Sequence, residues 1–171
     1  LLRERLSGLL PEEAIQDWLL EEDPGERPDR PQWFGRTWDQ AFSKPHRRDQ
    51  GIFFTPQELA SAMTEPVLSL QASSLVVDLS CGAGELLRAA ISKRPDVRVL
   101  GVEKDPWLGV AAALTILETR QETRSSGKGD RVWIGDGLAS ELPGLSPSSV
   151  DLVLGNPPYL GEKGRKDEFE R

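Results

Sequence analysis

The chain has few of the residues that form covalent or metal cross-links. Its 171 residues include a single cysteine, Cys81, and a single histidine, His46. One cysteine excludes an internal disulfide, and the pair is too small a ligand set for a structural zinc site. We therefore expect no metal, and a fold that rests on its apolar core.

Long apolar runs are also absent. No stretch is long enough to span a membrane, and no signal peptide is visible. Because a lone cysteine also suits a reducing compartment, these features predict a cytoplasmic protein without membrane contact.

Positive charge is scarce too: the chain has 21 Lys and Arg residues but 28 Asp and Glu residues, which gives a net charge of −7. That balance opposes binding to the phosphates of nucleic acids.

The length suits one domain with a sizeable core, preceded by an extension. We place a helical and irregular extension at residues 1–48 and the main domain at residues 49–171. Within the extension, residues 1–27 predict a short amphipathic helix, which we expect to cover the main domain rather than to bind a partner. Its basic stretch, residues 28–48, carries four interleaved aromatic residues, which leaves open either a packed segment or a nucleic-acid contact.

The most informative stretch follows an apolar strand expected from Asp151 to Leu154. Gly155-Asn156-Pro157-Pro158-Tyr159 ends that strand, which we expect to be parallel and buried. In open α/β sheets, ligands bind beyond the carboxyl ends of the strands. The Asn156 amide oxygen and the Pro157 carbonyl are two hydrogen-bond acceptors, and the two prolines fix their geometry. With the flat face of Tyr159, they suit a planar NH2 group and favour its pyramidal, nucleophilic form. An ordinary strand with a proline turn is the alternative.

A strand, a glycine turn and a helix follow one another from Leu75 to Arg94. This order predicts the first unit of a doubly wound α/β sheet, with the turn at Ser80-Cys81-Gly82-Ala83-Gly84. A nicotinamide dinucleotide site would need a third glycine where Leu87 stands. The turn therefore favours a ligand that needs close backbone approach but carries no pyrophosphate.

Two further predicted strands end at acidic residues. Residues 97–103 end at Glu103, about twenty residues beyond the glycine turn, where a carboxylate can accept both hydroxyls of a ribose. Residues 131–134 are followed by Asp136. Asp105 and Pro106 begin a helix between these strands. Nearer the N-terminus, Thr55 is placed to cap a helix that starts at Pro56.

In this order the segments resemble the N-terminal half of adenine-specific DNA methyltransferases of bacterial restriction-modification systems. The matching residues are Gly51 to Pro56 (motif X), Asp78 to Leu87 (motif I), Glu103 (motif II), Asp136 (motif III) and Asn156-Pro157-Pro158-Tyr159 (motif IV). The resemblance implies a Rossmann-like methyltransferase sheet of seven strands, of which this chain supplies about four. It also implies S-adenosylmethionine as the cofactor.

Residue roles follow from that resemblance. It places Phe54, Thr55 and Pro56 near the methionine end of the cofactor, and Asp78, Cys81, Gly82 and Gly84 in the cofactor loop. Glu103 would bind the ribose, Asp136 the adenine amine, and Asn156 both cofactor and target. Lys104 and Gly137 stand where the family often has an apolar and an aromatic residue, so the walls of the adenine pocket depart from the family's pattern here.

The implied reaction is direct methyl transfer to the N6 amine of an adenine flipped out of DNA, with Asn156 and Pro157 holding the amine and Tyr159 stacked on the base. Because the chain begins at Leu1 and ends soon after this motif, we expect a fragment. DNA would then be bound through regions outside it, by a recognition domain or subunit.

Two other functions stay open. The same motif IV chemistry serves enzymes that methylate protein glutamine or a base in RNA, although the Gly51 to Pro56 segment favours DNA. A cofactor-binding module without catalytic activity is the other alternative, supported by the altered residues Lys104 and Gly137.

Overall fold

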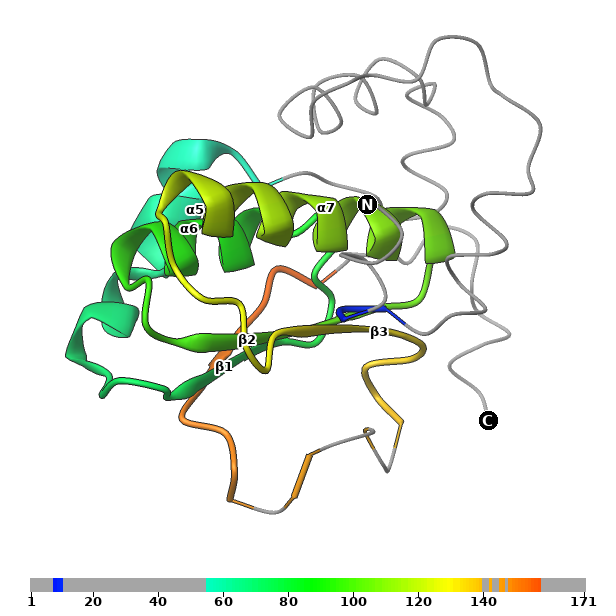
Figure 1. The fold of residues 1–171 in the computed structure, drawn as a ribbon. Coiled ribbons are helices and arrows are strands. Elements are labelled where there is room, and N and C mark those ends of the chain that lie inside the picture. The colour runs from blue at the N-terminus through cyan, green and yellow to red at the C-terminus, as the bar shows by residue number, and fades with distance from the viewer. Residues whose placement is uncertain (1–7, 11–54, 140–141, 143–144, 147, 158–171) are drawn as a thin grey trace, which may run out of the picture.

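The computed structural model describes residues 8–10, 55–139, 142, 145–146 and 148–157. Within these ranges the chain forms a parallel four-stranded sheet in the order β3-β2-β1-β4, with its helices packed on one face (Figure 1). The strand order reverses at β1, with β2 and β3 on one side and β4 on the other, which confirms the predicted α/β doubly wound fold. Phe54, Pro158, Tyr159 and almost all of the expected 1–48 extension lie outside the described residues.

Strands and helices alternate along the described chain. Helix α5 (Gln57–Met63) and the 3₁₀ helix η1 (Glu65–Ser69) precede the sheet. The sheet is formed by β1 (Leu75–Asp78), β2 (Arg98–Glu103), β3 (Arg131–Ile134) and β4 (Leu152–Leu154). Helix α6 (Glu85–Lys93) connects β1 to β2, and α7 (Pro106–Glu122) connects β2 to β3.

The register aligns the carboxyl ends of the strands. Asp78, the last residue of β1, lies opposite Gly101 of β2 and Leu154 of β4. On the far side of β2, Glu103 lies opposite Ile134 of β3. Because all four strands run in the same direction, the loops that follow them emerge at one edge of the sheet.

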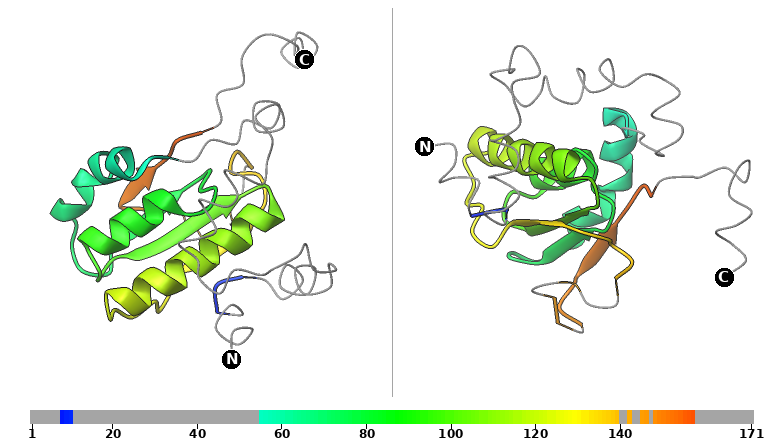
Figure 2. Two further views of the ribbon diagram at one scale, coloured as in Figure 1. Left: turned by 90° about the horizontal axis from the view of Figure 1, so that it is seen from above. Right: turned by 90° about the vertical axis from the view of Figure 1, so that its right-hand side faces the viewer.

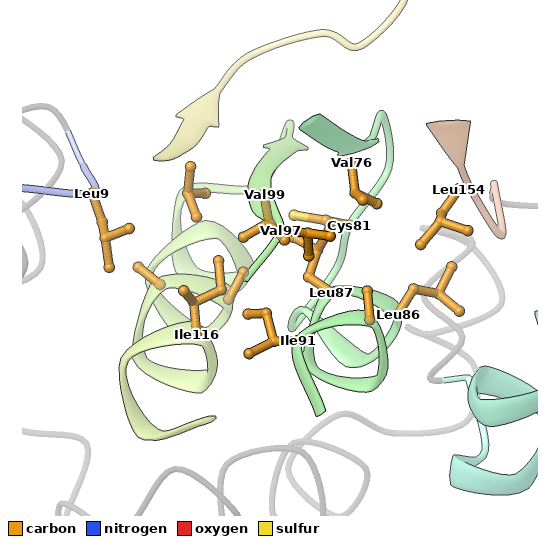
Figure 3. Packing of buried hydrophobic residues seen from close by; sticks show 14 of the residues in the cluster. Leu9, Val76, Cys81, Leu86, Leu87, Ile91, Val97, Val99, Ile116 and Leu154 are labelled. Atoms are coloured by element: carbon orange, nitrogen blue, oxygen red, sulfur yellow. The ribbon is translucent and has the colours of Figure 1, made fainter. Parts of the chain in front are cut away.

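The main core lies between the sheet and the helices. Figures 1 and 2 show α5, α6 and α7 on the same face, and Figure 3 shows aliphatic side chains of α6 and α7 meeting those of the strands. Leu87, Ile91, Ile116, Val76 and Val99 are all fully buried there. Burial of such side chains is worth about 1.5–3 kcal/mol each, so this layer dominates the stability of the domain.

Two residues near the start of the chain also belong to this core. Leu9 and Leu10 are buried in the main cluster, and the Leu9 carbonyl accepts a hydrogen bond from Val132 N of β3 at 2.8 Å. The start of the expected extension is thus tied to the outer edge of the sheet, although the boundary at residue 48 stays a prediction.

The opposite face of the sheet carries a smaller apolar cluster. Leu75, Val77 and Leu100 form it, with half-buried neighbours in the segment that leads to β4. We expected β4 to be buried, but Val153 is 57% exposed and only Leu154 of this strand is buried. Since β4 is the outermost strand and pairs only with β1 in the described sheet, the prediction of a fully buried strand is wrong. None of the described helices is long and apolar enough to cross a membrane.

Candidate active site at the carboxyl edge of the sheet

The sequence-predicted site residues that the structure describes follow the carboxyl ends of the strands. Asp136 follows β3, Glu103 ends β2, the glycine turn follows β1 and Asn156 follows β4. Because the strand order is β3-β2-β1-β4, these groups lie along one edge in that sequence. Topology therefore arranges an acid, a second acid, a glycine turn and an amide in a row.

The two glycines of the turn have different surroundings. Gly82 and Gly84 both have positive φ angles, of 53° and 89°, which favour glycine. A Cβ on Gly82 would meet nothing within 4 Å, whereas one on Gly84 would lie 3.1 Å from Ala112 Cα of α7. The space above Gly82 is open to a ligand, and Gly84 instead lets the turn pack closely on α7.

The side chain of Cys81 points away from this open space. It is buried in the main core among Leu87, Val97 and Val99 (Figure 3), and burial raises the pKa of its thiol well above the usual value. A Cβ on Gly101 would lie 2.8 Å from Cys81 Sγ, so glycine at position 101 makes room for the sulfur. Any contact of Cys81 with a ligand would therefore come from its backbone.

Glu103 connects the glycine turn to the start of α7. Its Oε2 accepts a hydrogen bond from Gly82 N at 2.8 Å, and its Oε1 accepts one from Asp105 N at 2.9 Å. Burial raises the pKa of Glu103, and these two N–H donors oppose that rise. Each oxygen retains a further lone pair, so the oriented carboxylate can still accept from the two hydroxyls of a ribose.

Asp78 is buried beneath the same turn. Its Oδ1 accepts a hydrogen bond from Ser80 N at 3.0 Å, and its side chain is almost inaccessible to solvent. Burial raises the pKa of Asp78 to about 7; the Ser80 N–H opposes this rise, and the negative charge of Glu103 adds to it. The turn therefore has two neighbouring carboxyl groups, which favour a positively charged ligand when both are ionised.

Asp136 occupies the β3 end of the row. Its Oδ1 accepts a hydrogen bond from Leu138 N at 3.0 Å, and its Oδ2 lies 3.7 Å from Lys104 Nζ. Both side chains of this ion pair are exposed, which leaves Asp136 accessible to a donor such as an aromatic amine. This pair could not be predicted from the sequence, because Lys104 and Asp136 come together only when β2 and β3 lie side by side in the sheet.

Gly137 has a packing role that its sequence position did not reveal. A Cβ at this residue would lie 2.0 Å from the carbonyl oxygen of Leu79, so no side chain fits here without moving the backbone. The absence of an aromatic residue at position 137 thus follows from the close contact between two loops.

Thr55 and Asn156 come together across the site. Asn156 Nδ2 donates a hydrogen bond to Thr55 Oγ1 at 3.2 Å, which leaves Asn156 Oδ1 as an acceptor. The predicted capping role of Thr55 is wrong: the N-cap of α5 is Pro56, and no side chain caps this helix. Since the Thr55 hydroxyl instead accepts from a residue 101 positions away, a local capping pattern could not reveal its partner.

These groups fit S-adenosylmethionine. Asp136 can accept from an adenine amine, Glu103 can accept from ribose hydroxyls, and the open space above Gly82 admits a ligand beside the backbone. The acids of the turn suit the positive charges of the sulfonium and ammonium groups. Asn156 lies at the other end of the row. Among the described residues, no three His, Cys, Asp or Glu side chains gather in a way that could hold a metal ion.

Comparison with known families yields a match over most of the chain. The model described as N-6 DNA Methylase matches residues 34–170. In the crystal structure of a type I restriction-modification system methyltransferase subunit from Streptococcus thermophilus, a similar fold aligns with a TM-score of 0.54 and 25% sequence identity. That alignment covers 63% of this chain and 23% of the subunit.

Curated relatives differ in what they modify. The type II methyltransferase M.CvrRI of Paramecium bursaria Chlorella virus XZ-6E is 26% identical over 118 residues, 69% of this chain and 27% of the relative. The release factor glutamine methyltransferase of Mycolicibacterium smegmatis (strain ATCC 700084 / mc(2)155) is 32% identical over 118 residues, 68% of this chain and 39% of that enzyme. This chain therefore spans well under half the length of these relatives.

Proposed function

We propose that this chain, which belongs to the N-6 DNA methylase family, binds S-adenosylmethionine and places its methyl group beside the N6 amine of adenine in DNA. The observation that carries this proposal is the row of groups along the carboxyl edge, which ends at Asn156. The row runs from Asp136, which would accept from the adenine amine of the cofactor, to Asn156, which would hold the target amine.

The chain's own residues would supply binding and orientation. Asp136 accepts from the cofactor's adenine amine, Glu103 accepts from its ribose hydroxyls, and the backbone at Gly82 allows close approach. The bound cofactor supplies an electrophilic methyl group on a sulfonium. Glu103, together with Asp78 when its buried carboxyl group is ionised, would balance the positive charge of the bound cofactor.

The target amine would be held by two acceptors. Asn156 Oδ1 and the Pro157 carbonyl each accept one N–H of the adenine N6 group, which favours the pyramidal form with a free lone pair. Positive charge develops on this nitrogen as it attacks, so both hydrogen bonds strengthen in the transition state. Tyr159, which lies outside the described residues, is expected to stack on the flipped base. No strong general base is needed, because the methylated nitrogen loses its proton readily.

Adenine in DNA is favoured over the other substrates by the match to the N-6 DNA methylases over residues 34–170. Methylation of glutamine is the second candidate, because the glutamine methyltransferase relative is 32% identical to this chain. An RNA base can be methylated by the same amine chemistry and is the third candidate substrate. A module without catalytic activity was supported in part by the missing aromatic residue at Gly137. Close packing against Leu79 explains this absence, so Gly137 no longer supports that alternative.

Further parts of the enzyme would bind the DNA. The chain has a net charge of −7, and relatives of known activity are more than twice as long as the matched region. We propose that a recognition domain or subunit, outside these 171 residues, makes the phosphate contacts. A cytoplasmic location fits this role.

The test is methyl transfer by the full-length protein from S-adenosylmethionine with a labelled methyl group. DNA, RNA and a release factor are offered separately, and the product is digested and identified by mass spectrometry. We expect N6-methyladenine in DNA. Asn156→Ala should lower turnover by about 10²–10³-fold, as expected for loss of one transition-state hydrogen bond, with a smaller effect on DNA binding.

The matched control is Gln71→Ala, which removes an exposed amide near the amino end of β1, away from the site. It should leave turnover unchanged. If only the release factor or only the RNA becomes labelled, that molecule is the substrate and the proposal of a DNA substrate is wrong. Near-normal turnover of Asn156→Ala would contradict the proposed amine chemistry.

A further inference from the structure

We infer that Thr55 is a positioning residue, whose hydroxyl sets the orientation of the Asn156 amide so that Oδ1 faces the target amine. This inference rests on the proposed function of Asn156. The resemblance implies that Thr55 contacts the cofactor. In the role inferred here, Thr55 instead acts on the reaction through Asn156.

The geometry joins two segments that are distant in the chain. Asn156 Nδ2 donates to Thr55 Oγ1 at 3.2 Å, and Thr55 is buried while Asn156 is half-buried. The Thr55 hydroxyl makes no capping bond to α5, so this helix does not compete for it.

An asparagine amide needs such a partner to hold one orientation. Its terminal torsion is broad and roughly two-fold, so nitrogen and oxygen exchange places at little cost. In the reversed orientation, Nδ2 would point at the target amine, which is itself a donor. In the structure the Thr55 hydroxyl accepts from Nδ2, and this hydrogen bond leaves Oδ1, which can only accept, toward the amine.

The backbones of both partners are also restricted. Thr55 precedes Pro56 and Asn156 precedes Pro157, and a residue before proline is confined to extended conformations. Thr55 is β-branched, which limits its χ1 as well. Once these restrictions apply, the two side-chain torsions of Asn156 are the main freedom left, and the hydrogen bond to Thr55 limits them.

A spectroscopic test is possible because Asn156 is the chain's one asparagine. Asparagine labelled with ¹⁵N in its side chain therefore gives a single NH2 group in the NMR spectrum of the 171-residue chain. We expect Thr55→Val, which keeps the shape and removes the hydroxyl, to shift this signal and speed its exchange with water. Thr55→Ser should restore both.

The control is Thr64→Val. Thr64 is fully buried at the end of the same helix and donates to Ala60 O, with no bond to Asn156. This variant loses a buried hydroxyl but should leave the Asn156 NH2 signal in place. An unchanged signal in Thr55→Val, or an equal shift in Thr64→Val, overturns the inference even if the protein methylates adenine.

Activity of the full-length protein gives the second readout. Thr55→Val should lower kcat by roughly 2- to 10-fold, as expected for loss of one neutral hydrogen bond, and leave the Kd for S-adenosylmethionine within about 2-fold. Thr55→Ser should recover kcat. A weakened Kd with unchanged kcat would make Thr55 a cofactor contact and overturn the inference. If no substrate is methylated, the proposed function fails, while the NMR result still decides whether Thr55 orients Asn156.

Discussion

At the scale of single residues, the buried carboxyl group of Asp78 should make stability depend on pH. Burial raises its pKa from 3.8 to about 7 in the folded state. Between these values the unfolded chain has lost the proton and the folded chain still holds it. The free energy of unfolding should therefore fall as pH rises from about 4 to about 7, by at most about 1.4 kcal/mol per pH unit from this group.

Asp78→Asn tests this dependence, since it removes the titration and keeps an oxygen that accepts from Ser80 N. The variant should gain stability relative to the wild type as pH rises from 5 to 8 in urea unfolding of the chain. Glu58→Gln, at an exposed position of α5, is the control and should leave the slope unchanged. A constant difference between Asp78→Asn and wild type across this range would show that Asp78 ionises normally.

Individual contacts were the least predictable part of the site. Local patterns could place Asp105, which caps α7 by accepting from Trp107 N and Leu108 N. The same reasoning failed for Thr55, because its partner is brought close only by the fold. It also could not find the contact of Gly137 with Leu79, since close approach between two loops leaves no mark on the composition of either.

At the scale of elements, one buried ion pair fixes the end of α7. Arg120 donates to both carboxylate oxygens of Asp130 and to the carbonyls of Pro95 and Val97, and Asp130 accepts from Val99 N. These bonds tie the helix to the segments that lead into β2 and β3, at the edge opposite the site.

Arg120→Ala should therefore destabilise the chain by about 3–5 kcal/mol, because it leaves Asp130 buried without a partner. Arg120→Lys should recover only part of the loss, since a single ammonium cannot reproduce the guanidinium fork. Lys93→Ala removes a more exposed pair with Glu65 and should cost at most about 1 kcal/mol in the same urea experiment. Equal effects of Arg120→Ala and Lys93→Ala would contradict the structural role of the buried pair.

Most elements were predictable because their patterns are local. The expected strand at residues 131–134 matches β3, and the expected helix at 85–94 matches α6 to within one residue. The exposure of β4 was not predictable, because an apolar run does not reveal whether its strand lies inside or at the border of a sheet. Val153 belongs to an apolar run but is exposed, because its strand lies at the border of the described sheet.

At the scale of the whole molecule, topology turns separate sequence segments into one site. Alternating strands and helices predicted a parallel sheet, and hence strand ends that meet at one edge. The order of the strands was not contained in that alternation. It places Asp136, Glu103, the glycine turn and Asn156 in a row, so the length and direction of the site emerge only from the folded sheet.

The most direct test of this account is calorimetry of cofactor binding, with Glu103 and the ribose hydroxyls changed together. Wild-type chain and Glu103→Ala are each titrated with S-adenosylmethionine and with its 2′,3′-dideoxy analogue. Because Glu103→Ala also removes the acceptor of Gly82 N and Asp105 N, only the coupling between residue and hydroxyls isolates the proposed contact. We predict that losing the hydroxyls weakens binding to the wild type by roughly 5- to 150-fold, equivalent to 1–3 kcal/mol, and hardly affects Glu103→Ala. Equal losses in both proteins, or no binding of S-adenosylmethionine to the wild type, would contradict the assignment of this edge as the cofactor site.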